Sequence, residues 1–344
     1  MNKIVCQDVD FFVKHFLFEE EIKKTKIAIT GATGLIGSTI IRCLLALNGE
    51  KSCEIKIVGF VRNTDKAKSL FPNANIKWIS YDLAKPCEIK ELNIDYIFHC
   101  ACPTSSKFYV ENPVELIKTS IQGSISILDY AVKNTVKGIV YLSSCEVYGS
   151  VDTDSVIDES YSGYVNPIDV RSGYPMAKRL VECLCHSYSR EYGVPVTIAR
   201  LTQTFGAGVA LSDNRVFAQF SKSAIMNKDI IMHTKGYSAK PYCYTIDAIN
   251  AFFYLIFKGK SGEAYNITNS ETYISICQLA EYIANNYSDY SKVIIEEKEG
   301  LGYAPVTKLH MSTKKVEALG WEPWYSMDQM FTNLINYYKS EINS

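Results

Sequence analysis

Tyr174 and Lys178 stand four residues apart, in the stretch YPMAK. Four residues make about one helical turn, so a helix here would present the phenol and the ammonium on one face. A phenol with a pKa near ~10 is a poor base at neutral pH, but a neighbouring positive charge favours the phenolate. Such a pair can take the proton of a hydroxyl group while a hydride leaves the same carbon. The spacing alone does not decide the matter, because Tyr254 and Lys258 repeat it in an apolar stretch typical of a buried helix.

Ser144 and Glu146 form a second polar group, roughly thirty residues before Tyr174 and at the end of a predicted strand over 137–143. Ligands of open α/β sheets bind at the carboxyl ends of the strands. There, Ser144 can hydrogen-bond a substrate hydroxyl or ketone, and Glu146 can act as an acid or a base. The alternative is a polar turn that only caps the strand.

Three glycines at intervals of three follow the β-branched stretch Lys26–Thr30 and open an apolar-periodic stretch over 35–47. We interpret these stretches as a buried strand, a tight turn and a helix. Glycines let the backbone approach a pyrophosphate, and a helix N-terminus offers free N–H groups and a positive dipole end. The pattern is typical of the first crossover of a dinucleotide-binding sheet. It predicts cofactor contacts at Gly31, Thr33, Gly34, Leu35, Ile36 and Gly37.

The ends of the next two predicted strands bear on the kind of dinucleotide. After the strand at 54–61, an acid would bind the ribose 2′-hydroxyl of NAD, but this chain has Arg62. A guanidinium can hold the 2′-phosphate of NADP with two hydrogen bonds, so we expect NAD(H) or NADP(H), with the 2′-phosphate form slightly favoured. Otherwise Arg62 lies on the adenine of NAD or is only solvated. Asp82 and Leu83 follow the strand Ile76–Ser80, at the expected edge of the adenine.

Strand and helix patterns alternate up to residue 201, which predicts a doubly wound parallel (Rossmann) sheet of the α/β class. We expect a dinucleotide-binding domain at 26–201 and a smaller C-terminal α/β substrate lobe at 202–344, with 240–258 returning to the first domain. Residues 1–25 predict a helical extension packed on the body, or else an oligomer contact. The further predicted strands are 95–100 and 194–201, and the further helices are 113–134, 174–192, 216–227, 275–286 and 327–339, with a strand–helix pair at 242–257.

Composition excludes several classes of partner. A net charge of −1 gives no electrostatic case for nucleic acid or for an acidic membrane surface, and no apolar run reaches the roughly 18 residues of a membrane span. The eleven cysteines are scattered, and pairs such as Cys100/Cys102 and Cys183/Cys185 have poor spacing for zinc. We therefore expect a cytoplasmic protein with reduced thiols and no metal site.

Several motifs stand together in an order that resembles the extended short-chain dehydrogenase/reductases: the glycine turn, His99-Cys100-Ala101-Cys102, Ser144-x-x-Val147-Tyr148-Gly149 and Tyr174-x-x-x-Lys178. More narrowly, the chain resembles the nucleotide-sugar epimerase/dehydratase family. It is most similar to UDP-glucuronate decarboxylases at 178–182, 200–206 and 213–216, and the stretches 244–247 and 319–323 also fit. The resemblance covers roughly Lys26 to the C-terminus.

The resemblance implies roles for particular residues. Ser144, Tyr174 and Lys178 would be catalytic, and Glu146 would be the acid or base of chemistry at C5 of a sugar. The cofactor would be tightly bound, with further contacts at Ala101, Tyr174 and Lys178. A nucleotide-diphosphate sugar would be the substrate, with contacts at Thr104, Ser144, Cys145, Gln203, Arg215 and Tyr244. In related enzymes the helices at 113–134 and 174–192 pair across a two-fold axis, and their apolar surface here favours a homodimer.

Some positions depart from the family's pattern. Ser120 stands where an Asn supports a proton relay, Gln203 replaces a common Asn, and Lys240 replaces an Arg that often contacts diphosphate. Cys145 stands where dehydratases carry an Asp, and a thiol with a pKa of about 8.5 is a weaker general acid than a carboxylic acid.

We therefore expect an enzyme that oxidises C4 to a 4-keto intermediate, of the decarboxylase/dehydratase type, in the synthesis of cell-surface polysaccharide sugars. The alternatives are a nucleotide-sugar 4-epimerase, an NADPH-dependent 4-keto-sugar reductase and a catalytically silent dinucleotide-binding regulator.

Overall fold

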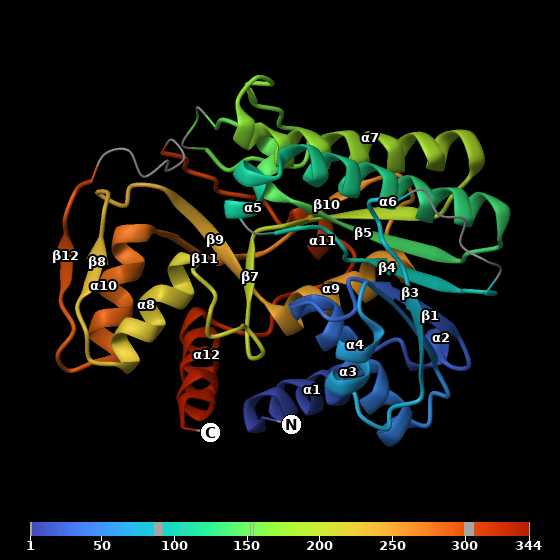
Figure 1. Ribbon diagram of the computed structural model, residues 1–344, viewed down its shortest axis with the longest axis horizontal. Coiled ribbons are helices and arrows are strands. Elements are labelled where there is room, and N and C mark those ends of the chain that lie inside the picture. Colours follow the sequence, from blue (N-terminus) through green and yellow to red (C-terminus); the bar gives the residue numbers. More distant parts are fainter. Residues whose placement is uncertain are drawn as a thin grey trace.

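A seven-stranded parallel sheet forms the centre of the molecule (Figure 1). The computed structural model describes residues 2–85, 92–104, 106–151, 153, 155–298 and 306–343. The strand order is β10-β6-β5-β4-β1-β2-β3. Successive strands are added on one side of β1 up to β3 and on its other side from β4 onward, so a topological switch point lies between β1 and β4. The strands are β1 (Lys26–Thr30), β2 (Lys56–Val61), β3 (Ile76–Ser80), β4 (Tyr96–His99), β5 (Gly138–Ser144), β6 (Val196–Leu201) and β10 (Ala264–Ile267).

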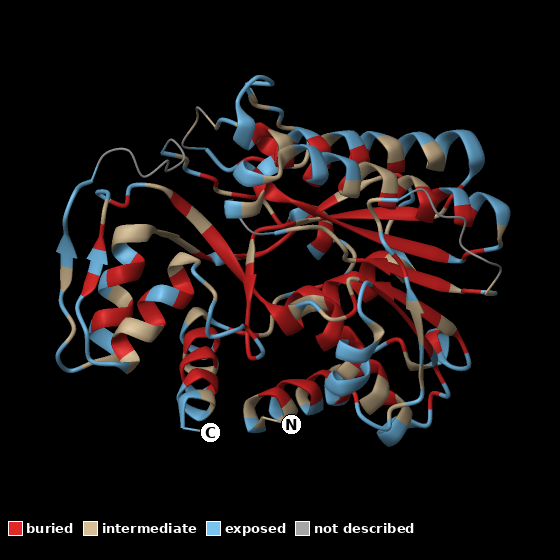
Figure 2. Cartoon of the chain, viewed as in Figure 1, coloured by how far each residue is buried: buried red, intermediate tan, exposed pale blue. Residues whose placement is uncertain are grey.

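The predicted doubly wound parallel sheet is confirmed, and its first six strands lie within two residues of the predicted bounds. The seventh strand, β10, was not predicted. It has only four residues and follows an irregular stretch of sequence, and its place in the sheet comes from pairing with β6 (Ala264 opposite Ile198). The inner strands are buried almost throughout, as expected for a sheet covered on both faces, whereas the edge strand β3 is only partly covered (Figure 2).

Helices cover both faces of the sheet (Figure 1). One face carries α5 (Ser106–Glu111), α6 (Pro113–Lys133) and α7 (Gly173–Tyr192), and the last two pack against each other. The other face carries α3 (Leu35–Lys51), α4 (Thr64–Leu70) and α9 (Thr245–Lys258). Helix α6 begins with Pro113, which needs no hydrogen bond for its nitrogen there, and α7 ends before Gly193, whose φ of 70° suits a helix C-terminus.

The C-terminal half adds two small sheets and a group of helices at one end of the molecule (Figure 1). Helices α10 and α12 each begin with a capping box, built by Ser275 with Gln278 and by Ser326 with Gln329. The sheets are β11-β9-β7 and β12-β8, from β7 (Gln203–Phe205), β8 (Ile230–Met232), β9 (Ala239–Tyr244), β11 (Asn269–Ser275) and β12 (Val293–Ile295). The helices of this group are α8 (Val216–Ile225), α10 (Ile276–Tyr287) and α12 (Met327–Ile342). Helix α11 (Lys314–Glu317) instead packs beside β10, and the short 3-10 helices η1 (Cys145–Tyr148) and η2 (Val170–Ser172) also lie near the main sheet.

The N-terminal segment forms α1 (Lys3–His15) and α2 (Glu19–Ile22) and packs on the body. Helix α1 contacts α3, α9 and α12, and buries Phe12 completely. The Asn2 amide donates to the Ser340 hydroxyl at 2.6 Å, so the two ends of the chain meet. Over the described ranges, we find no helix with both the length and the apolar character needed to cross a bilayer.

Candidate active site

Tyr174 and Lys178 lie on the first turns of α7, and both side chains are buried. The Lys178 ammonium donates to the Leu142 carbonyl at 2.6 Å, at the carboxyl half of β5. It lies 5.8 Å from the centre of the Tyr174 ring and 4.7 Å from that of Tyr141. Helix packing on the sheet therefore holds both groups at the carboxyl end of β5.

Ser144 ends β5 and caps the short helix η1. Its hydroxyl accepts a hydrogen bond from the Glu146 amide at 3.2 Å and also hydrogen-bonds the Tyr174 phenol. The structure thus brings Ser144 into contact with Tyr174, although 30 residues separate them in the chain.

Burial raises the pKa of Tyr174 well above its ordinary value. Nearby Tyr109, Cys102 and Glu146 raise it further, whereas the hydrogen bond from Ser144 lowers it. The phenol is therefore neutral in this structure. A role for Lys178 in lowering this pKa stays a prediction, because the ammonium donates to a carbonyl group.

Glu146 projects from η1 and reaches solvent, although protein atoms crowd around it. This loss of water raises the pKa of its carboxyl, and the positive charges of Lys240 and Arg171 lower it. Lys240 comes from β9 and Arg171 from η2, so charges on two other elements act on this carboxyl. Arg171 stands three residues before Tyr174, and sequence reasoning missed it.

Tyr109 of α5 is a second residue that sequence reasoning missed. Its ring stacks on the Tyr174 ring, with the centres 4.4 Å apart and the planes 9° from parallel, and the two phenols hydrogen-bond. Tyr109 is buried, and Glu146 and Arg215 also act on it electrostatically. The position of Tyr109 relative to the recognised motifs does not predict a site residue, so only the packing of α5 shows that it contacts Tyr174.

The glycine turn has the shape that a pyrophosphate requires. Gly31 has a φ of +65°, and its carbonyl accepts from the Gly34 amide at 2.9 Å. A Cβ on Gly37 would lie 2.4 Å from the Gly31 carbonyl oxygen, so this position needs glycine. A Cβ on Gly34 would meet only that oxygen, at 3.3 Å, among the described atoms within 4 Å, and so would project into open space beside the helix start. Here a side chain would fill the cradle, so the residues fit a dinucleotide.

The other predicted cofactor residues surround this turn or lie at strand ends. The Ala101 amide donates to Thr30 at 3.1 Å beside Gly31. Arg62 is exposed at the end of β2, Asp82 is exposed and accepts from the Ala84 amide, and Leu83 packs on Gly123 of α6. Thr33, Leu35 and Ile36 are all partly exposed at the start of α3.

Of the predicted substrate residues other than Ser144, Cys145 and the side-chain oxygen of Gln203 are buried, whereas Arg215 and Thr104 reach the surface. Cys145 is buried beside Ser144, and burial raises the pKa of its thiol to about 11, which makes it a still poorer proton donor. The buried Gln203 Oε1 has no hydrogen-bond partner within the ranges that the structure describes. Arg215 is partly exposed and pairs with Asp213 at 2.7 Å, while Thr104 is exposed.

Tyr244 is wrongly predicted as a substrate contact. Its side chain is 0% exposed, and its hydroxyl donates to Asp8 of α1 at 2.7 Å in the interior. Sequence reasoning missed this because α1 lies more than two hundred residues away in the chain. The hydroxyl of Ser120 donates to the Leu116 carbonyl of its own helix at 2.8 Å.

A dinucleotide turn at the switch point of a doubly wound sheet, next to a Ser–Tyr–Lys group, defines the extended short-chain dehydrogenase/reductase class. Within it, the chain belongs to the NAD dependent epimerase/dehydratase family, whose model matches residues 27–268. It is an NAD(P)-dependent enzyme of the nucleotide-sugar epimerase, dehydratase and decarboxylase group.

Known relatives agree with this assignment. UDP-glucuronic acid decarboxylase 5 of Arabidopsis thaliana is 32% identical over 301 residues, which cover 87% of this chain and 84% of the relative. UDP-glucuronic acid decarboxylase 1 of Danio rerio is 27% identical, over 95% of this chain and 75% of the relative. Among solved structures, UDP-glucose 4-epimerase of Thermotoga maritima has a TM-score of 0.77 at 21% identity, over 92% of this chain and 100% of that one. This last likeness shows the shared fold.

Proposed function

We propose that this enzyme oxidises a nucleotide-linked hexose at C4 to a 4-keto intermediate and then carries out chemistry at C5. One observation supports this most directly: Ser144 hydrogen-bonds Tyr174, and Glu146 follows Ser144 in the same turn, near enough to act on the same sugar. Oxidation at C4 makes C5 substituents labile, because negative charge at C5 can delocalise into the ketone.

The residues of the chain have distinct tasks in this proposal. Tyr174 takes the proton of the C4 hydroxyl, Ser144 hydrogen-bonds the developing ketone, and Lys178 favours the phenolate through its charge. The glycine turn from Gly31 to Gly37 holds the cofactor's pyrophosphate. When bound, the oxidised nicotinamide supplies a further positive charge and accepts the hydride from C4.

Glu146 and Cys145 together favour loss of CO₂ or proton exchange at C5 over loss of the C6 hydroxyl. A departing hydroxide needs a strong acid beside it, and the thiol of Cys145 has a raised pKa. The relatives named UDP-glucuronic acid decarboxylases support a substrate with a C5 carboxylate and a uridine nucleotide. Lys240 and Arg171, which act on Glu146, provide the positive charge that such a carboxylate requires.

A 4-epimerase is the second candidate, and several solved structures of this fold carry that name. A reductase that consumes NADPH is a third, which the exposed Arg62 would suit; on the same ground we place NADP slightly ahead of NAD. A silent regulator is less consistent with a complete Ser144, Tyr174 and Lys178 group. Synthesis of cell-surface polysaccharide sugars in the cytoplasm is the setting that we propose.

We also propose a homodimer. Helices α6 and α7 pack side by side and leave apolar side chains on their outer faces, among them Val114 (63% exposed), Met176 and Leu180. A two-fold axis beside these helices would bury both sets in a four-helix bundle.

A pair of variants tests the reaction. Tyr174→Phe should abolish reduction of the bound cofactor, because no group then takes the hydroxyl proton. Glu146→Gln should still reduce the cofactor but stall before product, so that the 4-keto sugar accumulates. The measurements are nicotinamide absorbance and mass spectrometry of products from a panel of UDP-, GDP-, CDP- and dTDP-sugars. Tyr290→Phe and Glu322→Gln, at exposed positions, are the matched controls.

The outcomes separate the candidates. Loss of the mass of CO₂ supports decarboxylation, conversion to a distinct product of unchanged mass supports epimerisation, and a gain of two hydrogens with added NADPH supports the reductase. If Glu146→Gln turns over as the parent does, chemistry at C5 is wrong. If the parent converts no sugar nucleotide, a catalytically silent dinucleotide-binding regulator replaces the enzyme as the proposed function.

A further inference from the structure

A buried ion pair lies behind the candidate active site, between Arg200 of β6 and Glu182 of α7. The guanidinium Nη2 lies 2.7 Å from the carboxylate Oε2, and the two side chains are only 14% and 10% exposed. The Arg200 Nε contributes two more contacts to the carboxylate, at 3.1 and 3.2 Å. Taking two charges out of water is costly, so a pair with such geometry calls for an explanation. The proposed reaction uses neither residue.

The first contact of this pair is with Ser143, the residue directly before Ser144. The Ser143 hydroxyl donates to Glu182 Oε1 at 2.5 Å. In the sheet, Ser143 and Arg200 are neighbours in the parallel pairing of β5 with β6. The start of the segment that carries Ser144 and Glu146 is therefore held by both members of the ion pair.

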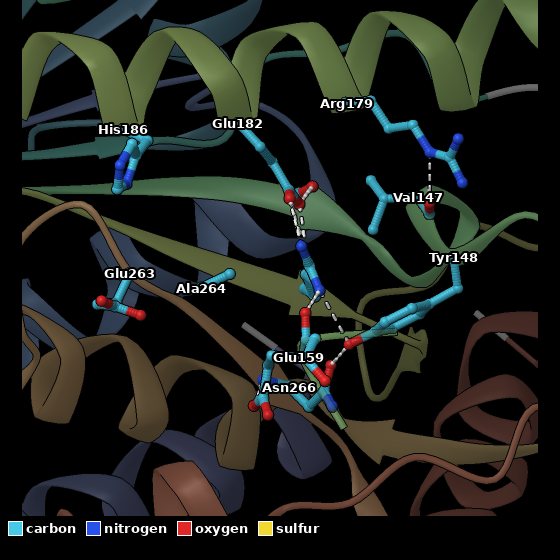
Figure 3. A network of polar contacts seen from close by, with 12 residues as sticks. Val147, Tyr148, Glu159, Arg179, Glu182, His186, Glu263, Ala264 and Asn266 are labelled. Atoms are coloured by element: carbon cyan, nitrogen blue, oxygen red, sulfur yellow. Dashed lines mark hydrogen bonds and ion pairs between the residues drawn. The ribbon is translucent and has the colours of Figure 1, made fainter. Parts of the chain in front are cut away.

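The second contact is with Tyr148, at the other end of the segment (Figure 3). Arg200 Nη1 donates to the Tyr148 hydroxyl at 3.1 Å, and that hydroxyl donates to Asn266 Oδ1 of β10 at 2.5 Å. The Tyr148 ring is completely buried, with the guanidinium carbon 4.9 Å from its centre. Arg200 Nη1 also donates to the Glu159 carbonyl at 2.8 Å. Both ends of the six-residue segment from Ser143 to Tyr148 are thus tied to one ion pair.

Helix α7 supplies these ties as well as the reacting pair. Arg179 follows Lys178 and donates to the Val147 carbonyl at 2.6 Å (Figure 3), and Glu182 lies one helical turn beyond Lys178. The spacing of Tyr174 from Ser144 therefore depends on contacts from the same helix.

We propose that Arg200 and Glu182 are positioning residues that fix Ser144 and Glu146 against Tyr174. This inference rests on the proposed function of that site. Only a single short turn, η1, carries Glu146, and its side chain reaches solvent. The ties at Ser143 and Tyr148 supply the order that this turn does not have by itself, and misplacement of a reacting group by about 1 Å can cost ~100-fold in rate.

Two mild variants test the inference. Ser143→Ala removes the tie at one end and Tyr148→Phe the tie at the other, and both leave the ion pair of Arg200 with Glu182 in place. Glu182→Gln would leave the buried guanidinium without its countercharge and is expected to fold poorly, so the mild variants decide. We expect each to lower kcat about tenfold with KM for the sugar nucleotide within about twofold. Amide hydrogen exchange over residues 144–149 should become faster in both.

Glu263→Gln is the matched control. Glu263 directly precedes β10, and its carboxylate pairs with Lys315 at 3.0 Å and with Lys260 at 3.4 Å. Figure 3 shows this carboxylate apart from Tyr148, and the substitution removes none of the hydrogen bonds that hold Ser143 and Tyr148. It should keep the parent's kcat and the parent's exchange over 144–149.

The inference is overturned if amide hydrogen exchange over residues 144–149 is as slow in Ser143→Ala and Tyr148→Phe as in the parent. It is equally overturned if their kcat, corrected for the folded fraction, equals that of the parent, since the ion pair would then only stabilise the fold. If the parent converts no sugar nucleotide, the proposed function fails, and the exchange measurement alone still decides whether the ion pair orders the segment.

Discussion

Asp8 of α1 is a buried carboxylic acid whose ionisation should control stability. Tyr244 and Tyr325 donate their hydroxyls to it at 2.7 and 3.3 Å, and the Asn333 amide donates at 3.3 Å. Burial raises the pKa of Asp8 from 3.8 to about 7, and the three hydrogen bonds oppose that shift only in part. Asp247 of α9 lies near enough to interact with it, and burial raises its pKa to about 7 as well.

The sign of the effect follows from proton binding. Between pH ~4 and ~7 the folded chain keeps the Asp8 proton while the unfolded chain loses it, so the free energy of unfolding falls as the pH rises. The slope is about 1.4 kcal/mol per pH unit, and the whole shift amounts to about 4 kcal/mol. This stability is complete below pH ~4 and lost once the pH exceeds ~7. Cys43 of α3, which also faces Asp8, stays neutral throughout because burial raises the pKa of its thiol.

Asp8→Asn removes the titration while keeping the size of the side chain. Urea unfolding at steps from pH 4.5 to 8 should show the variant gaining on the parent by about 1.4 kcal/mol per pH unit between pH 5 and 6.5. Asp10→Asn, at an exposed position on the same helix, is the matched control and should follow the parent at every pH. Asp247 is present in all three proteins, so its titration cancels apart from its coupling to Asp8, which Asp8→Asn removes.

Parallel stability curves for the parent and Asp8→Asn would refute this reasoning. They would mean that Asp8 is already ionised in the folded protein, because water reaches it directly or through local opening of α1.

Three other predictions concern binding and assembly. Gly34→Val should abolish dinucleotide binding in calorimetry, because the new side chain fills the space beside the turn; undiminished binding would remove the cofactor from this site. Arg62→Ala should weaken the binding of NADP more than that of NAD. An equal loss of affinity for both, or a loss confined to NAD, would reverse our preference for NADP. Light scattering at micromolar concentration should give a dimer mass for the parent and a monomer mass for Leu180→Glu, whereas a monomeric parent would contradict the pairing of α6 with α7.

Much of the fold could be read from local pattern. The run Lys26–Thr30 is β-branched and apolar, as a strand covered on both faces must be, and the structure begins and ends β1 at these residues. The start of α3 follows from the glycines, since Gly34 is the residue before the helix. Helix α7 could be expected from its periodicity, which puts Tyr174 and Lys178 one turn apart whatever else the chain does.

The partners of those residues could not be read in this way. Tyr244 lies in a strand buried on both faces, so its alternation with Cys243 does not say which neighbour its hydroxyl meets. That neighbour is Asp8, brought there by the packing of α1 on α9 and α12. The stacking of Tyr109 on Tyr174 likewise depends on how α5 lies against α7.

The sequence by itself determined the elements, the glycine turn and the identity of the groups that can do chemistry, because these depend on neighbours within a turn or a strand. Only the tertiary structure decided that β10 completes the main sheet, that the charges of Arg171 and Lys240 act on Glu146, and that Glu182 and Arg200 tie the two ends of its segment. These contacts join elements far apart in the chain. Their geometry depends on how buried faces pack, which a one-dimensional pattern of apolar and polar residues does not specify.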